Sequence, residues 1–162
     1  MEIGKEITQK SFKSPQEKAL INILFTSHWY ERMTMHTLKP HGLSGEQYNV
    51  LRILRGNKEE PYRLKDIQHR MINRTSNTTR LVEKLRLKNL IQREVSEQSR
   101  REVLISITQE GLVLLEEIDL KMGEVQAILD KAMPADKAEI LSDILDEFRT
   151  VYSLKENNKE TK

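Results

Sequence analysis

The feature that most constrains the fold is a change in the spacing of apolar residues near residue 90. Before it, in residues 81–85, apolar side chains follow the three- and four-residue steps of an amphipathic helix. After it, the period is two: Ile91, Arg93 and Val95 alternate with polar residues, and Val103, Ile105 and Ile107 alternate with Leu104, Ser106 and Thr108. The intervening segment 97–100 has no apolar side chain. This pattern predicts a β-hairpin with a charged tip in an otherwise helical chain.

Two helical segments lie directly before the hairpin. Residues 64–71 carry the apolar face of a short helix, and a break follows at 72–74. Thr75 or Ser76 is then predicted to cap a longer helix, which ends at Asn89 because asparagine tolerates the left-handed conformation of a helix stop. Helix, turn, helix and hairpin in this order indicate a winged helix-turn-helix, so the predicted fold class is mainly α with a small β-hairpin wing.

Long helices flank this lobe. Ser14 is predicted to cap a helix that runs to about Leu38, and Ser44 to cap the next one. The first of these helices is apolar around most of its circumference, so it needs more than one neighbour, and a second subunit is a candidate. Further helices are predicted for 108–131, with a coiled-coil-like seam, and for 134–154.

The charge distribution singles out the predicted lobe. The net charge is only +2. Residues 62–101 nevertheless carry 11 basic and 4 acidic groups, a net +7, whereas residues 102–162 carry 7 basic and 14 acidic groups, a net −7. A local basic block is typical of a surface that binds a polyanion, although a solvated charged surface would look the same by this measure.

The predicted helix of the basic block begins with an unusual run of polar side chains. Six residues without an apolar member stand there, and cations surround them, which suits the reading of base edges and phosphates better than it suits core packing. The alternative is a series of caps on a solvated first turn. The candidate DNA-binding residues of this region are Arg70, Arg74, Thr75, Ser76, Asn77, Thr78, Thr79, Arg80 and Lys84.

The hairpin tip adds Arg100 and Arg101 as further candidates. An arginine at the end of a thin β-ribbon can enter the narrow minor groove, where the potential is most negative. An ordinary polar turn is the alternative for this segment. With the adjacent helix, the tip completes a candidate interface with double-stranded DNA.

These segments resemble the multiple-antibiotic-resistance regulator (MarR) family, a bacterial family of dimeric transcription regulators, usually repressors. The resemblance covers roughly residues 15–153 and is most specific in 75–85, 90–93, Arg101 and 104–111. It implies a helical dimerisation region formed by 14–39 and 108–154, and a winged helix-turn-helix DNA-binding lobe formed by 43–107. The helix that begins at Thr75 would enter the major groove and Arg101 the minor groove. Residues 1–13 and 155–162 are expected to be flexible termini.

Three departures from the family pattern matter. Ser99 stands where the family wing usually has an aspartate that orients the arginine, so Ser99 joins the candidate DNA-binding residues, with Glu97 as another possible acceptor. Asn89 replaces the usual glycine after the reading helix. The chain contains no cysteine, so switching by thiol oxidation, as in the peroxide-sensing branch, is excluded.

The resemblance also implies a small effector, often an aromatic or phenolic anion, that releases DNA. Aromatic rings beside a cation suit such a ligand. The alternative is that the tryptophan and tyrosine belong to the core. The candidate ligand-binding residues are Phe25, His28, Trp29, Arg32 and Tyr48.

Other chemistries find little support in the sequence. The four histidines are scattered, so no metal site is predicted, and no cofactor is expected. No glycine-rich phosphate loop, nucleophile elbow or His-Glu-x-x-His motif is present, so we expect no enzyme. No apolar run reaches the roughly 18 residues of a membrane span, and no signal peptide is recognisable, so a cytoplasmic protein without membrane contact is expected.

Two hypotheses of different classes follow. The first is a homodimeric, sequence-specific DNA-binding transcription regulator of a pseudo-palindromic operator, which we expect to be a repressor. The second is a winged-helix protein-interaction module that binds neither DNA nor a small ligand. The concentration of +7 on the predicted helix and hairpin favours the first, because an interaction module has no need of it.

Overall fold

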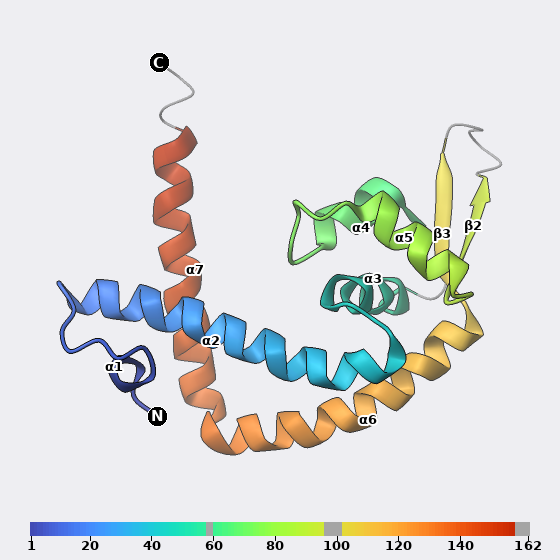
Figure 1. Cartoon of the computed structure of the whole chain (residues 1–162). Coiled ribbons are helices and arrows are strands. Elements are labelled where there is room, and N and C mark those ends of the chain that lie inside the picture. Colours follow the sequence, from blue (N-terminus) through green and yellow to red (C-terminus); the bar gives the residue numbers. More distant parts are fainter. Residues whose placement is uncertain (58–59, 96–101, 158–162) are drawn as a thin grey trace. The chain divides into compact units, whose positions relative to one another are not determined.

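A computed structural model describes residues 1–57, 60–95 and 102–157, with their side chains up to residue 150. The chain forms two compact units, Met1–Leu120 and Lys121–Lys162. Its elements are α1 (Ile3–Glu6), α2 (Pro15–Leu38), the 3-10 turn η1 (Lys39–His41), α3 (Gly45–Arg55), β1 (Tyr62–Arg63), α4 (Leu64–Arg70), α5 (Thr78–Leu87), β2 (Ile91–Val95), β3 (Val103–Ile107), α6 (Gln109–Ala132) and α7 (Ala135–Asn157). All of them except η1 and β1 are labelled in Figure 1.

The predicted helix starts at Ser14 and Ser44 are confirmed. The Ser14 hydroxyl accepts a hydrogen bond from the backbone N–H of Glu17 at 3.1 Å. Ser44 and Gln47 form a reciprocal capping box, in which each side chain accepts from the other residue's backbone N–H. Each cap satisfies N–H groups that the first turn of a helix leaves without partners, which fixes where α2 and α3 begin.

The predicted β-hairpin is also confirmed. β2 and β3 pair antiparallel, with Ile91 opposite Ile107 and Val95 opposite Val103. The structure adds β1, which pairs antiparallel with β3 to give the strand order β1-β3-β2. The sequence did not predict β1, because two residues are too few to show a period of two.

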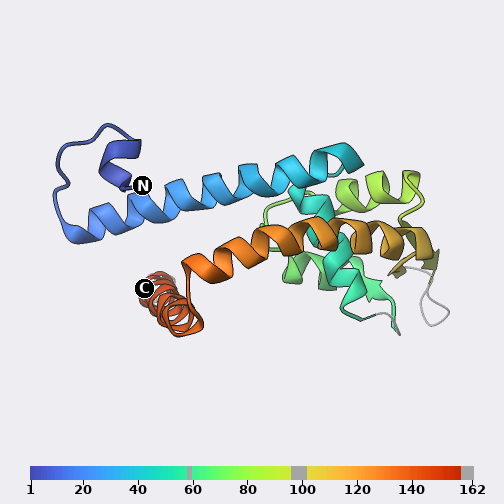
Figure 2. The ribbon, with the colours of Figure 1, turned by 90° about the horizontal axis from the view of Figure 1, so that it is seen from below.

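The core of the first unit lies around α3, which packs against α2, α4, α5 and β3. Figure 2 shows the C-terminal end of α2 against this winged-helix lobe, while the N-terminal part of α2 extends away from it. Apolar side chains from six elements meet in the core, and each buried leucine or isoleucine contributes about 2 kcal/mol by leaving water. The largest fully buried side chains are Leu38, Val50, Leu51, Leu54, Ile67, Val82, Leu85, Ile105, Leu115 and Ile118.

A compact junction joins α5, β2 and α6. Asn89 has the left-handed φ of 58° expected of a helix stop. The Thr108 hydroxyl donates to the carbonyl of Asn89 at 2.8 Å and accepts from the N–H of Gly111 at 3.1 Å, so it caps α6. A Cβ atom at Gly111 would lie 2.3 Å from the carbonyl oxygen of Leu90. Only glycine therefore allows α6 to start this close to the α5–β2 connection.

The expectation of a flexible terminus for residues 1–13 differs from the structure. One helical turn, α1, forms there and buries Ile3, while the Lys18 ammonium lies 5.7 Å from the centre of the Phe12 ring and 3.4 Å from a carboxylate oxygen of Glu2. The segment thus has apolar and charged contacts with the start of α2. At the other end, α7 continues to Asn157 rather than ending near 154, and residues 158–162 lie outside the described residues.

The second unit consists of the C-terminal part of α6 and of α7. The carbonyl of Pro134 accepts from the N–H groups of Lys137 and Ala138, so α7 begins where the sequence predicted. Its apolar residues Ile140, Leu141, Ile144 and Phe148 remain exposed in the single chain. Among the described residues, no helix combines the length and the apolar character needed to cross a membrane.

Candidate nucleic-acid interface

The reading helix α5 starts later than the sequence predicted. Asn77, not Thr75 or Ser76, is the cap: its side-chain oxygen accepts from the N–H of Arg80 at 3.0 Å. Thr75 instead donates through both its N–H and its hydroxyl to the side-chain oxygen of Asn73, at 3.2 and 2.7 Å. The polar run therefore combines an asparagine turn with an asparagine cap, two local motifs that compete for the same residues.

Thr78 is a correction to the set of candidate DNA-binding residues. It is only 4% exposed, and its hydroxyl donates to the carbonyl of Ser76 at 3.4 Å. Thr78, Val82 and Leu85 are spaced by four and three residues, so they share the inward face of α5. A side chain on that face cannot reach a nucleic acid that docks on the outer face.

The outer face of α5 and the preceding turn carry cations without acidic partners. Arg74, Arg80 and Lys84 are exposed, and within the described part of the chain none of their side chains forms an ion pair. Arg70 is exposed as well, with its guanidinium 5.1 Å from the centre of the Tyr62 ring. Thr75, Asn77 and Thr79 are exposed beside them, and Ser76 is half-buried. Of the nine candidates predicted in this region, all except the buried Thr78 are therefore at least partly exposed.

A second set of cations, around the root of the wing, is fully paired. Glu83 on α5 accepts from Arg86 at 2.8 to 3.2 Å and from Arg93 on β2 at 3.4 Å. Glu102, just before β3, lies 3.2 Å from Arg63. The hydrogen bonds from Arg86 hold the pKa of Glu83 below its usual value, so this carboxylate is ionised at neutral pH.

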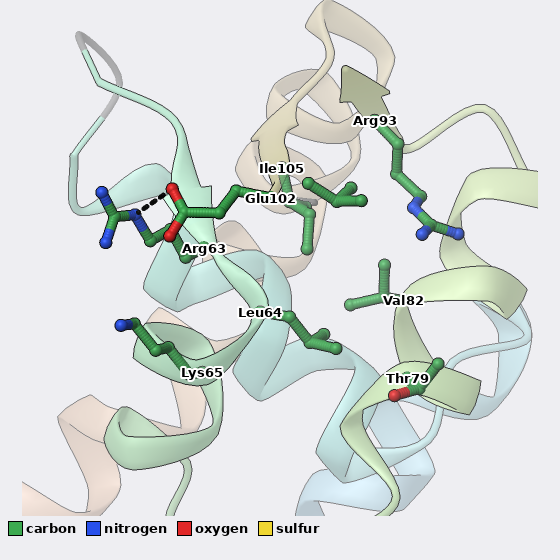
Figure 3. A pocket seen from close by; sticks show the side chains of 9 residues that line it. Arg63, Leu64, Lys65, Thr79, Val82, Arg93, Glu102 and Ile105 are labelled. Carbon is green, nitrogen blue, oxygen red and sulfur yellow. Dashed lines mark ion pairs between the residues drawn. The ribbon is translucent and has the colours of Figure 1, made fainter. Parts of the chain in front are cut away.

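A cavity of about 250 Å³ lies between α4, α5 and the root of the wing, where α5 also contacts β2 and α4 contacts β3. Figure 3 shows its apolar side chains, Leu64, Val82 and Ile105, together with Thr79 of α5. The paired Arg63 and Glu102 lie on one side of it, and Arg93 points toward α5 on the other. The helices and the outer part of the hairpin are therefore not in continuous contact.

The wing-tip candidates Ser99, Arg100 and Arg101 lie outside the described residues, as does Glu97. Their roles stay predictions from the sequence. Sequence reasoning missed three contributors that the structure places beside the interface: Asn73, Tyr62 and Glu83. The spacing of Glu83 and Arg86 along a helix was the one readable signal, whereas the other contacts depend on how the chain folds back.

The candidate effector residues do not line this cavity. Phe25, His28, Trp29 and Arg32 lie along α2, where the ring nitrogen Nδ1 of His28 is 2.8 Å from the carbonyl oxygen of Leu24. Trp29 is 37% exposed in the single chain, so it is not a core residue of this protomer.

Tyr48 of α3, the fifth effector candidate, lies beside a cation. The Arg52 guanidinium lies 5.8 Å from the centre of its ring. Burial raises the pKa of the Tyr48 hydroxyl, and Arg52 opposes that shift. Arg55, one turn further along α3, forms an ion pair with Asp119 of α6. Among the described residues, no three histidine or acidic side chains gather closely enough to hold a metal ion.

Comparison with known proteins decides what kind of molecule carries this interface. Residues 32–118, from the middle of α2 into α6, match the family model for the transcriptional regulators SarA and Rot. The chain belongs to this family. The HTH-type transcriptional regulator MhqR of Bacillus subtilis is 30% identical over 105 residues, which cover 63% of this chain and 71% of MhqR.

Solved structures share the fold at lower identity. A MarR-like regulator from Bacillus cereus gives a TM-score of 0.71 at 17% identity, with 83% of this chain and 96% of that chain covered. The MepR–DNA complex of S. aureus gives 0.72 at 22%, with coverages of 80% and 94%. MarR of E. coli gives 0.61 at 20%, with coverages of 78% and 92%. The predicted winged helix-turn-helix and the MarR resemblance are confirmed.

Family membership also settles the broad class of function. The family consists of transcriptional regulators, so the prediction that this chain is not an enzyme is confirmed. The matched segment spans the winged-helix lobe and leaves out α1, the first two thirds of α2, the second half of α6 and α7. The part that matches the family model is thus the lobe that carries Arg74, Arg80 and Lys84.

Proposed function

We propose that this regulator is a homodimeric repressor that binds a pseudo-palindromic site in double-stranded DNA, with one α5 helix in each of two successive major grooves. The observation that carries the proposal is a set of exposed cations before and along α5, Arg74, Arg80 and Lys84, which form no ion pair within the described residues. Phosphate groups bind such side chains and the N-terminus of the helix itself. MepR, which shares the fold, has been solved with DNA, and this supports the same kind of partner here.

The dimer is proposed on a separate observation. Helix α2, within the first unit, and helix α7, within the second, each carry exposed apolar side chains. A second copy of the chain is the occupant proposed, because two linked reading heads match the two halves of a palindrome. The exposed apolar residues on α2 are Leu20, Ile23, Leu24, Trp29, Tyr30 and Met35.

Selection of bound sequences from random duplex DNA tests the proposal. The expected result is an inverted repeat whose half-sites are centred about one helical turn, roughly 10 base pairs, apart. A consensus without twofold symmetry would contradict the dimeric docking. Absence of binding even at low ionic strength would contradict DNA binding altogether and favour a protein-interaction module.

Substitutions assign the contacts. Arg80→Ala is expected to relax base preference within the half-site, and Arg101→Ala to weaken binding to all duplexes and to reduce its salt dependence by about one counterion. Lys121→Ala, outside the lobe on α6, is the matched control and is expected to leave both properties unchanged. An unchanged salt dependence in Arg101→Ala would contradict the minor-groove role of the wing.

Release by a small aromatic anion completes the proposal, with Phe25, His28, Trp29, Arg32 and Tyr48 as the binding residues. The support is chemical: rings and a cation recognise an aromatic carboxylate. Trp29 is the single tryptophan of the chain, so its fluorescence reports directly on binding. Hydroxybenzoates are expected to quench it and to release the selected operator, and both effects should be lost in Arg32→Ala. Quenching that persists in this variant would exclude Arg32 as a ligand-binding residue.

A further inference from the structure

Two glutamates hold the three paired arginines at the root of the wing. Glu83 projects from α5 to Arg93 of β2, and Glu102 lies beside Arg63 at the start of α4. One ion pair therefore joins β2 to α5, and another joins Glu102, just before β3, to Arg63 of β1, the residue that precedes α4. The cavity between these pairs is lined by Arg63, Arg93 and Glu102 as well as by apolar side chains (Figure 3).

The cavity gives these ion pairs more influence than surface pairs usually have. Where side chains interdigitate, packing alone fixes the angle between two elements. Here the pocket leaves part of the space between α4, α5 and the strands unfilled, and among the described residues of β2 and β3 only Ile91 and Ile105 are fully buried. The direction in which the hairpin leaves the lobe then depends on contacts across the gap.

Glu83 is well placed to supply such a contact. Arg86 donates to both of its carboxylate oxygens, at 3.1 Å from Nε to Oε2 and 2.8 Å from Nη2 to Oε1. This two-point contact restricts the side chain of Glu83 and turns Oε2 toward Nη1 of Arg93, at 3.4 Å. Arg86 thus orients Glu83, and Glu83 orients Arg93.

We infer that Glu83 is a positioning residue for operator recognition: through Arg93 it sets the direction of the wing relative to α5. The inference rests on the proposed function. A fixed direction means that helix and wing fit the DNA together only where the grooves have the right spacing and width, so Glu83 contributes to the choice of site without contacting a base.

Whether Glu83→Gln strengthens or weakens binding to the operator distinguishes a positioning role from simple charge repulsion. A carboxylate on a DNA-binding surface repels phosphates, so by charge alone Glu83→Gln would strengthen binding to every duplex. A positioning role predicts the opposite for the operator, because the loss of the pair with Arg93 frees the wing. Non-specific duplex, which makes no demand on wing direction, then shows unchanged or slightly tighter binding.

The experiment compares Glu83→Gln with Glu94→Gln, on the selected operator and on a scrambled duplex. Glu94 is the matched control because it is exposed on β2 beside Arg93 and forms no ion pair within the described residues. Glu83→Gln is expected to weaken operator binding by about fivefold per half-site, the range of an exposed ion-pair network. Glu94→Gln should not weaken it. Operator binding that is unchanged or tighter in Glu83→Gln would overturn the inference.

A double-mutant cycle with Arg93→Gln tests the route of the effect. If Glu83 acts through Arg93, the double variant loses no more operator affinity than the more affected single variant. Additive losses would overturn the inference. Unfolding midpoints of all variants are expected to stay within a few degrees of wild type, whereas a merely structural role would move them together with the affinity. Failure of the wild-type protein to bind any duplex is a different result, because it removes the proposed function itself.

Discussion

The winged-helix lobe and the helices outside it differ in how far their apolar side chains are buried. In the lobe, α3, α4, α5 and β3 each bury at least one leucine or isoleucine almost completely, as at Leu51 and Leu85. On α7, Ile144 and Phe148 stay more than half exposed in the single chain. The lobe can therefore hold its own structure, whereas the outer helices depend on another surface for much of theirs. This contrast is the reason for proposing that the lobe recognises DNA and that the outer helices form the dimer.

The largest effect on stability is expected from disrupting the close contact between the start of α6 and the α5–β2 connection. Gly111→Ala would place a Cβ atom 2.3 Å from the Leu90 carbonyl oxygen and 2.8 Å from the Ile107 side chain. Backbone has to shift, so we expect the free energy of unfolding to fall by about 3 kcal/mol, measured by urea denaturation. Gly123→Ala on the same helix has no atom within 4 Å of its Cβ and is expected to be neutral or stabilising. Equal effects in the two variants would contradict the close-approach account.

An effect of similar size, but on the dissociation constant of the proposed dimer, is expected from a charge on α7. Ile144→Glu places a charge in the proposed dimer interface, and the lost burial of about 2 to 3 kcal/mol corresponds to a dimer dissociation constant raised about 100-fold. Analytical ultracentrifugation measures it. Leu87→Glu, on an apolar residue of the lobe that is also more than half exposed, is the control and should leave the dimer intact. A dimer that survives Ile144→Glu would place the interface elsewhere.

The smallest effect on stability is expected at the start of α5, where a hydrogen bond to the exposed Asn77 side chain, and not burial, stabilises the helix. Asn77→Ala removes the cap of α5 and should cost about 1 kcal/mol of stability, whereas Asn77→Asp keeps the acceptor oxygen and should cost much less. Thermal unfolding gives the comparison. If both variants are equally destabilised, the side-chain oxygen of Asn77 is not what stabilises the helix start.

Local signals in the sequence predicted most of the fold. The period of two in 91–95 and 103–107, the caps at Ser14 and Ser44, and the left-handed stop at Asn89 all act between neighbouring residues, so they can be read directly. The start of α5 was predicted wrongly. Three consecutive residues can each cap a helix, and only the turn formed by Asn73 decides that the cap is Asn77.

The candidate interface was predicted in outline and corrected in detail. The basic block could be identified from the sequence, because the charges of a segment can be counted without knowing its three-dimensional structure. The inward direction of Thr78 could not be read, since a threonine suits either face of a helix. The division of the arginines into paired and unpaired groups was likewise invisible, because Glu102 lies 39 positions after Arg63 in the chain.

By itself, the sequence determined that this protein is a winged helix-turn-helix with a basic reading head, because periodicity, capping and charge are properties of adjacent residues. Only the tertiary structure decided which cations are available for a polyanion and which are occupied by carboxylates. That distinction arises where the hairpin folds back on the helices and brings carboxylates close to some of the arginines. It distinguishes the residues proposed to bind DNA from Glu83, which is proposed to set the direction of the wing.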